Sequence, residues 1–223
     1  MNLHHQSRTA RRQGLTLVEL LVLVGAVVLL ALAFFPSRGH PIDAAYATAL
    51  KNKGRGIWIA VVSANSERGS DETNSFWPKE LGFDKLRTST EYFRSLMCDT
   101  NGCPTTNCNQ QVAWDLNPGM LSGAGVPCAQ STTQFSRTNN VWSVVCVDEE
   151  TPSGSLFLIT RNVDLGRQAN AASVPKLTRI RPFERTRAVW VTRGGGIFDA
   201  RPAYLTAARL FPSTNETYDV MYP

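Results

Sequence analysis

One long apolar run, Leu15–Phe35, constrains this chain more than any other segment. Thr16 and Glu19 are its only plainly polar residues. An α-helix rises about 1.5 Å per residue, so the run predicts a helix roughly 30 Å long, which matches the hydrocarbon core of a bilayer. A carboxylate in such a segment is costly and commonly has a partner and a role. Glu19 therefore either lies shallow, near the lipid headgroups, or is a functional charge.

Basic residues gather ahead of this run. The chain has 23 Lys and Arg against 18 Asp and Glu, a formal net charge of +5. Residues 1–14 contain Arg8, Arg11 and Arg12 and no acid, and without them the balance is 20 to 18. Such a balance gives no support to nucleic-acid binding. Positive charge beside a membrane-spanning segment stays on the cytoplasmic side, which is where we expect residues 1–14.

Helical periodicity continues beyond Pro36. Five apolar or small residues step by four and three along one helix face: Leu50, Gly54, Ile57, Val61 and Ala64. We expect one long helix from about Leu15 to Asn65, kinked at Pro36, whose second half packs on the head. The chain then divides into a basic leader (1–14), a membrane-spanning helix (15–35), its amphipathic continuation (36–65) and a globular head (66–223).

Residues 66–223 carry signals for a short helix followed by strands. Thr88 precedes a helix at Glu91–Met97 and has the spacing of a capping box with Glu91. Four β-rich segments follow, with a turn at Gly194–Gly196 between the last two: Val141–Val147, Leu156–Thr160, Arg187–Thr192 and Ile197–Asp199. Residues 203–210 read as a short helix. The predicted fold class is α+β, with the long N-terminal helix packed on a small antiparallel sheet.

Five cysteines mark an otherwise irregular, polar stretch of the head: Cys98, Cys103, Cys108, Cys128 and Cys146. Their spacing does not fit a zinc site with paired C-x2-C ligands. We interpret residues 98–128 as a loop stapled by disulfides in an oxidising compartment. The odd count leaves one thiol free or one bridge between chains, and the connectivity stays open.

No group of residues in the head has the pattern of an active site, so we expect neither an enzyme nor a cofactor. Asp148-Glu149-Glu150 could bind calcium through carboxylate oxygens. Three acids in a predicted hairpin turn are more typical of a solvated tip, and whether the head binds calcium or a secreted substrate stays open. The five scattered tryptophans are interpreted as core residues.

The segment Gly14-Leu15-Thr16-Leu17-Val18-Glu19 resembles the processing site of type IV pilins and type II secretion pseudopilins. The resemblance implies that a prepilin peptidase cuts between Gly14 and Leu15 and that the new N-terminus is methylated. Glu19 is then the fifth residue of the mature chain. It would pair with the amine of Leu15 on a neighbouring subunit and so set the register of assembly. We further hypothesise that the helix between Gly25 and Pro36 is weak and bends.

The resemblance thus predicts a structural subunit of a secretion pseudopilus or a pilus-like filament. Its expected partners are the prepilin peptidase, other pilin or pseudopilin subunits, an inner-membrane assembly platform and membrane lipid, with no nucleic acid. The expected location is the bacterial inner membrane, crossed once with a cytoplasmic N-terminus and a periplasmic head. The subunit would later join a periplasmic or cell-surface filament.

Two other interpretations stay open. Residues 1–33 could be an ordinary secretory signal with a cleavage site at Ala31-Leu32-Ala33, which would release a disulfide-containing binding protein starting near Phe34. Glu19 argues against it, because an acid serves no purpose in such a signal. The chain could also be a single-pass membrane protein with an enzymatic head, and the missing catalytic pattern argues against that.

Overall fold

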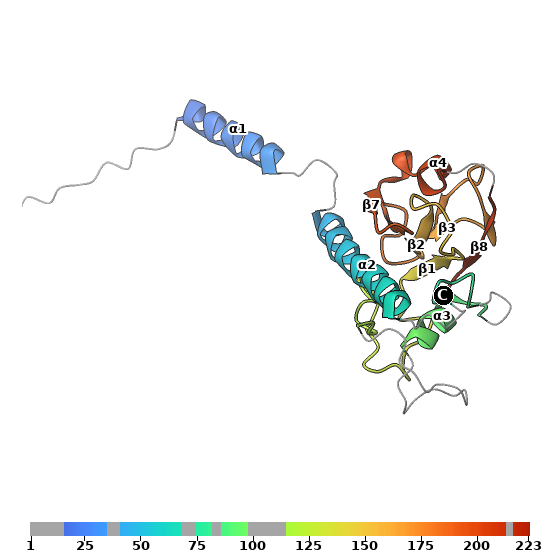
Figure 1. Cartoon of the computed structure of the whole chain (residues 1–223). Helices are drawn as coiled ribbons and strands as arrows, with labels where there is room; N and C mark the ends of the chain where they lie inside the picture. Colours follow the sequence, from blue (N-terminus) through green and yellow to red (C-terminus); the bar gives the residue numbers. More distant parts are fainter. Residues whose placement is uncertain (1–15, 35–40, 68–74, 82–85, 98–114, 213–215) are drawn as a thin grey trace, which may run out of the picture. The chain divides into compact units, whose positions relative to one another are not determined.

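The computed structural model describes residues 16–34, 41–67, 75–81, 86–97, 115–212 and 216–223 (Figure 1). The chain divides into two compact units, Met1–Gly39 and His40–Pro223. Among the described residues, the first unit holds the helix α1 (Leu17–Phe34) and the second holds every other helix and strand. The structure has both α and β content, and its sheets are antiparallel.

The predicted single long helix is wrong, because two separate helices are present. The first helix, α1, ends at Phe34, and α2 (Pro41–Glu67) begins seven positions later. The sequence between them contains Pro36 and Gly39, and α2 itself starts on a proline. Proline lacks a backbone donor and disfavours helix in the residue before it, yet suits the first position of a new helix. Pro36 therefore separates two helices, where we had expected a kink in one.

The prediction of a membrane-spanning helix is also wrong. In the described part of the chain, no helix is both long and apolar enough to cross a membrane. The helix begins after Thr16 and ends before Pro36, so α1 has 18 residues, or about 27 Å at 1.5 Å per residue. The predicted inner-membrane location, with a cytoplasmic N-terminus and a periplasmic head, loses its basis with that helix.

An antiparallel sheet forms the centre of the second unit. Its strand order is β4-β8-β1-β2-β6-β7, and β3 and β5 form a separate pair. The strand bounds are β1 (Trp142–Val145), β2 (Leu156–Thr160), β3 (Val163–Asp164), β4 (Gln168–Ala169), β5 (Lys176–Leu177), β6 (Ala188–Thr192), β7 (Ile197–Ala200) and β8 (Tyr218–Met221). The four predicted strands correspond to β1, β2, β6 and β7, whereas β3, β4, β5 and β8 were not predicted.

One helix, α2, covers one face of this sheet. The predicted stripe on α2 is buried throughout: Leu50, Gly54, Ile57, Val61 and Ala64. A Cβ atom added at Gly54 would lie 2.7 Å from Cγ2 of Val191 and 3.2 Å from the ring of Trp142. Gly54, which as a glycine weakens a helix, therefore allows α2 to approach β6 and β1 closely.

The opposite face is covered as well over the three central strands. All residues of β1, β2 and β6 are buried, and side chains alternate between faces along a strand, so neither face of these strands is open. Phe157 of β2 makes an edge-to-face contact with Trp77 at a centroid distance of 5.1 Å. The other described helices are α3 (Ser89–Leu96), with the predicted capping box from Thr88, a 3₁₀ turn η1 (Pro202–Tyr204), and α4 (Ala207–Leu210).

The described residues contain no disulfide, which corrects the prediction of a disulfide-stapled loop. Cys98, Cys103 and Cys108 lie outside the described residues. Cys128 is an exposed free thiol and Cys146 is a buried one. Residues 115–140 contain no regular helix or strand, so many of their backbone carbonyls need hydrogen-bond donors other than a neighbouring strand.

Basic side chains bind the backbone carbonyls of this irregular segment. Lys53 of α2 donates to the carbonyls of Gly119 and Ser122 at 2.7 and 2.8 Å. Arg94 of α3 donates through Nε to the carbonyl of Phe135 at 2.9 Å. Arg161 donates through Nη1 to the carbonyls of residues 137 and 140. Hydrogen bonds from charged donors are stronger than neutral ones, and these bonds hold carbonyls between residues 119 and 140 in place.

Candidate functional site

The first candidate site is the beginning of α1. The backbone N–H and the hydroxyl of Thr16 each donate to Oε2 of Glu19 at 2.9 Å, and the N–H of Glu19 donates back to the Thr16 hydroxyl at 3.3 Å. This reciprocal arrangement is a capping box. The backbone hydrogen bond from Thr16, and then its hydroxyl, lower the pKa of Glu19. Glu19 is therefore a carboxylate that already has a local structural role.

From Leu17 to Leu29, the surface of α1 is apolar apart from Glu19. Ten large apolar side chains between Leu17 and Leu29 are each between 51% and 78% exposed. A Cβ atom added at Gly25 would meet nothing within 4 Å. A helix that is apolar all round is normally buried, so α1 presents a surface that another apolar partner has to cover.

The remaining predicted residues of this site are only partly described. Gly14, Leu15 and Pro36 lie outside the described residues. Gly25 lies inside α1, which runs through it as unbroken helix. The cleavage site and the proposed bending between Gly25 and Pro36 therefore stay predictions.

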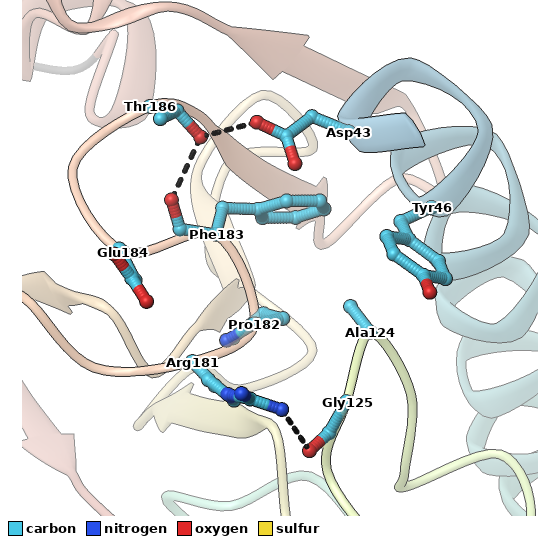
Figure 2. A pocket seen from close by; sticks show the side chains of 9 residues that line it. All are labelled: Asp43, Tyr46, Ala124, Gly125, Arg181, Pro182, Phe183, Glu184 and Thr186. Atoms are coloured by element: carbon cyan, nitrogen blue, oxygen red, sulfur yellow. Dashed lines mark hydrogen bonds between the residues drawn. The ribbon is translucent and has the colours of Figure 1, made fainter. Parts of the chain in front are cut away.

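A second candidate site is a cleft of about 340 Å³ beside the first turns of α2 (Figure 2). Asp43 and Tyr46 of α2 form one wall, and the loops 123–125 and 181–186 form the others. Nine residues line the cleft: Asp43, Tyr46, Ala124, Gly125, Arg181, Pro182, Phe183, Glu184 and Thr186. Three segments far apart in the sequence thus meet here.

Two positions of the cleft have unusual backbone conformations. Ala124 has a φ of 50° and Glu184 a φ of 51°, in the left-handed region that costs residues other than glycine roughly 1–2 kcal/mol. Two residues that follow β2 fix the conformation of the loop 181–186. Arg161 donates a hydrogen bond to the carbonyl of Arg181, and Asn162 donates one to the carbonyl of Glu184. Such conformations persist where the surrounding structure imposes them, and they are enriched at binding sites.

A third site is a cleft of about 770 Å³ near β4 and β8. It is lined by Arg87, Thr88, Arg167, Gln168, Asp219, Val220, Tyr222 and Pro223. Tyr222 is fixed by its hydroxyl, which accepts from the N–H of Leu165 at 2.8 Å. Burial raises the pKa of this hydroxyl to about 12, so Tyr222 stays neutral at physiological pH.

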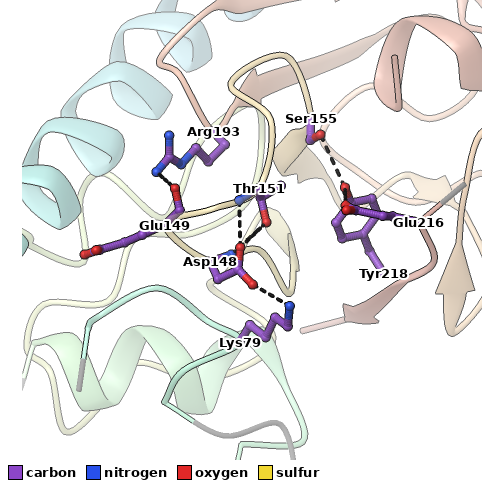
Figure 3. A network of polar contacts seen from close by, with 8 residues as sticks. All are labelled: Lys79, Asp148, Glu149, Thr151, Ser155, Arg193, Glu216 and Tyr218. Carbon is purple, nitrogen blue, oxygen red and sulfur yellow. Dashed lines mark hydrogen bonds and ion pairs between the residues drawn. The ribbon is translucent and has the colours of Figure 1, made fainter. Parts of the chain in front are cut away.

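The acidic turn Asp148-Glu149-Glu150 joins a network of polar contacts (Figure 3). Asp148 accepts from the N–H and hydroxyl of Thr151, at 2.7 and 2.6 Å, and pairs with Lys79. Burial alone would raise the pKa of Asp148, but the hydrogen bonds from Lys79 and Thr151 lower it overall. The carbonyl of Glu149 accepts from Arg193. Asp148 thus stabilises the turn that follows β1. The described residues contain no group of three or more acidic, His or Cys side chains placed to bind a metal ion.

Comparison with protein-family models, with curated proteins and with solved structures finds no match. The sequence directed attention to Glu19 at the start of α1, whose role in assembly stays a prediction, and it did not predict either cleft. The hydrogen bond between Asp43 and Thr186 joins residues 143 positions apart, so no local sequence pattern predicts it. The one available signal was Gly-Ala-Gly at 123–125 together with Arg181-Pro182, which mark two turns with restricted backbones.

Proposed function

We propose that this protein is a structural subunit of a pilus-like filament, either a type II secretion pseudopilus or a type IV pilus. It would be cut after Gly14 by a prepilin peptidase and assembled with other subunits through α1. The second unit, His40–Pro223, would then be the part of the subunit that faces its surroundings.

The exposed apolar surface of α1 is the observation that carries this proposal. Burying one Val or Leu side chain contributes about 1.5–3 kcal/mol, and ten large apolar side chains of α1 are exposed. Copies of the same helix, packed in parallel, would cover that surface on every side. A helix that only had to pack on its own head would need one apolar face.

The residues at the start of α1 support the same proposal. Thr16 and Glu19 follow the predicted cut closely, and their capping box begins the helix there. A helix that starts directly after the new N-terminus would expose a free amine at its beginning, where Glu19 of another subunit could reach it. We assign the carboxylate of Glu19 to that pairing in addition to the cap.

The mass and N-terminal sequence of the mature protein test this proposal. After co-expression with a prepilin peptidase we expect a chain that starts at N-methylated Leu15, and a Gly14→Ala variant that stays uncut. A start near Phe34 would indicate a secreted binding protein instead. An uncut chain in the presence of an active peptidase would overturn the proposal.

A further inference from the structure

We propose that strand β7 pairs edge to edge with β7 of a second copy of this chain, which would join two six-stranded sheets into one. This inference uses residues of the second unit alone, and it holds whether or not the chain assembles into a filament through α1.

The first argument is the set of backbone groups that β7 leaves unpaired. The N–H of Thr192 donates to the carbonyl of Gly196 at 2.8 Å, and the antiparallel register continues from there along β6 and β7 without a shift. In such a ladder, alternate residues direct their N–H and carbonyl toward the neighbouring strand. Ile197 and Asp199 therefore direct theirs away from β6. The strand β7 ends the sheet, and no described residue bonds to these outward groups.

The second argument is that β7 lacks the features that usually protect an edge strand. Proteins keep such strands very short, or place Lys, Pro or a bulge in them. At the other edge of the sheet, β4 has only two residues. The strand β7 has four, contains neither Lys nor Pro, and pairs with β6 without a bulge. Its one charged residue, Asp199, is engaged with Lys51 and Arg187 of its own chain.

The third argument is the exposed ring of Phe198. It is 48% exposed and stacks on Trp190 of β6 at a centroid distance of 5.6 Å. These two residues lie directly opposite each other, and hence on the same face of the sheet. Asp199, which pairs with Lys51 of α2, lies on the other face. The helix α2 therefore does not cover Phe198, and the ring stays available to a strand that adds to this edge.

A second copy satisfies this edge by symmetry. A twofold axis at Phe198 places Ile197 of each chain opposite Asp199 of the other, and every outward N–H and carbonyl of these residues then has a partner. The two Phe198 side chains come directly opposite each other, with Cβ atoms about 4.5–5.5 Å apart. Arg201 lies opposite Gly195 of the other chain, so no like charges face each other directly.

The length of β7 sets the expected strength of this pairing. A pair of four-residue strands buries less than the roughly 1,200–2,000 Å² of a stable interface, so we expect a weak and reversible dimer. The competing explanation is a solvated edge, whose backbone groups bond to water and whose Phe198 is one of the apolar side chains found on any protein surface. The two explanations predict different exchange rates for particular N–H groups.

Amide hydrogen exchange of the native full chain, followed by NMR at a low and a high chain concentration, tests the proposal. We expect the N–H groups of Ile197 and Asp199 to exchange at least roughly tenfold more slowly at the high concentration. The N–H groups of Phe198 and Ala200 bond to β6 in either state, so they are internal controls and should change little. Exchange of Ile197 and Asp199 that does not depend on concentration, whether fast or slow, would overturn the proposal.

Photo-cross-linking identifies the occupant of the edge. The photoreactive residue p-benzoylphenylalanine replaces Phe198 in an equal mixture of isotopically light and heavy full chains, so that a cross-link between copies is recognised by its mass. We expect cross-links into residues 197–201 of the second copy. The same residue at Val174, which is 74% exposed between β4 and β5, reports any background from chains that associate through α1. In whole cells, cross-links from position 198 to a different protein alone would overturn the proposed occupant.

Two variants of Ile197 test the hydrogen bonds of this pairing. Ile197→Pro removes an outward N–H and leaves the bonds to β6 in place, since proline is tolerated on the open side of an edge strand. Ile197→Ala is the matched control, because it also loses the apolar side chain but keeps the N–H. We expect Ile197→Pro to lower the yield of the cross-link from position 198 at least roughly tenfold, and Ile197→Ala less than about twofold. Circular dichroism verifies that both variants fold. Equal yields from the two folded variants would refute the pairing.

Discussion

The ammonium group of Lys51 on α2 lies 2.8 Å from Oδ1 of Asp199 on β7. Arg187, the residue before β6, pairs with the other carboxylate oxygen. The Asp199 side chain is only 21% exposed, so this pair is screened less than a surface pair. One carboxylate thus joins the helix to the edge of the sheet.

Asp199→Asn should lower the free energy of unfolding at pH 7 by about 1–3 kcal/mol, because two cations lose their partner. Burial alone would raise the pKa of Asp199, but Lys51 and Arg187 lower it overall. A lowered folded-state pKa contributes stability above the unfolded-state pKa of about 3.9, and this is lost as the pH falls through the folded-state value. The difference between native and variant chains in urea unfolding should therefore shrink below about pH 4. A difference that is the same at pH 7 and at pH 3, or a similar loss in the exposed-acid control Asp115→Asn, would contradict this account.

Gly54→Ala should destabilise the protein by about 1–3 kcal/mol, although alanine is the better helix former. The new methyl group would lie 2.7 Å from Val191, inside a packed interface that has to shift. Gly56→Ala is the matched control on the same helix, since its methyl would meet only the flexible end of Met120 at 3.3 Å. Denaturant midpoints of the two variants give the measurement. Equal stability of the two would mean that α2 does not depend on close approach at Gly54.

Arg161→Met should lower the free energy of unfolding by about 2–3 kcal/mol, because it leaves carbonyls of two loops without their donor. Arg161 donates to Arg181 through Nε and to residues 137 and 140 through Nη1. Arg161→Lys should recover little, since an ammonium cannot reproduce the guanidinium fork. Arg137→Met is the control, because that exposed residue contributes its carbonyl and not its side chain. Limited proteolysis should show faster cleavage within 178–187 in the Arg161 variants alone.

Local sequence patterns predicted the helices and strands whose formation depends on residues close together in the sequence. The Thr88 capping box, the buried stripe on α2 and the segments that became β1, β2, β6 and β7 all carry short-range signals. The strand β8 carries almost none, since it has four residues with Asp219 among them, and its pairing with β1 more than 70 positions away fixes it. Long-range pairing of short strands is a tertiary effect that periodicity does not report.

The helix boundary and the loop staple were mispredicted for different reasons. Pro36 alone predicts a kink, but a second proline, Pro41, stands at the first position of α2, and two prolines so close together favour a break. The cysteine spacing suggests disulfides, whereas in the described residues Lys53, Arg94 and Arg161 bind carbonyls between residues 119 and 140. A basic side chain gives no sequence signal for such a role.

Cys128 and Cys146 should differ sharply in reactivity. Cys128 is exposed, whereas burial raises the pKa of the Cys146 thiol to about 12, and the thiolate is the reactive form. At pH 8 Cys146 is therefore almost entirely in the thiol form. Brief iodoacetamide treatment of the native chain should modify Cys128, and Cys146 should react only after denaturation, as peptide mass spectrometry would show. Labelling of both at similar rates would mean that the core around β1 opens readily.

The two roles assigned to Glu19 predict opposite results for two variants. Glu19→Gln keeps a side chain that can complete the capping box with Thr16 but removes the charge. Thr16→Val keeps the charge but removes the hydroxyl that donates to Glu19 at 2.9 Å and accepts from its N–H. If assembly depends on a charge pair with the amine of Leu15, Glu19→Gln should reduce incorporation into filaments by roughly tenfold or more, and Thr16→Val should reduce it only slightly.

Filament yield, normalised to cleaved protein, gives the measurement, because both variants must first be cut after Gly14. Circular dichroism of the purified chains reports the helix content separately, and we expect a small loss for Thr16→Val alone. Should Thr16→Val abolish filaments while Glu19→Gln leaves them intact, Glu19 would act only as a helix cap and the charge pairing would be wrong. The comparison separates the two roles, because the capping box by itself gives Glu19 a structural function within its own subunit.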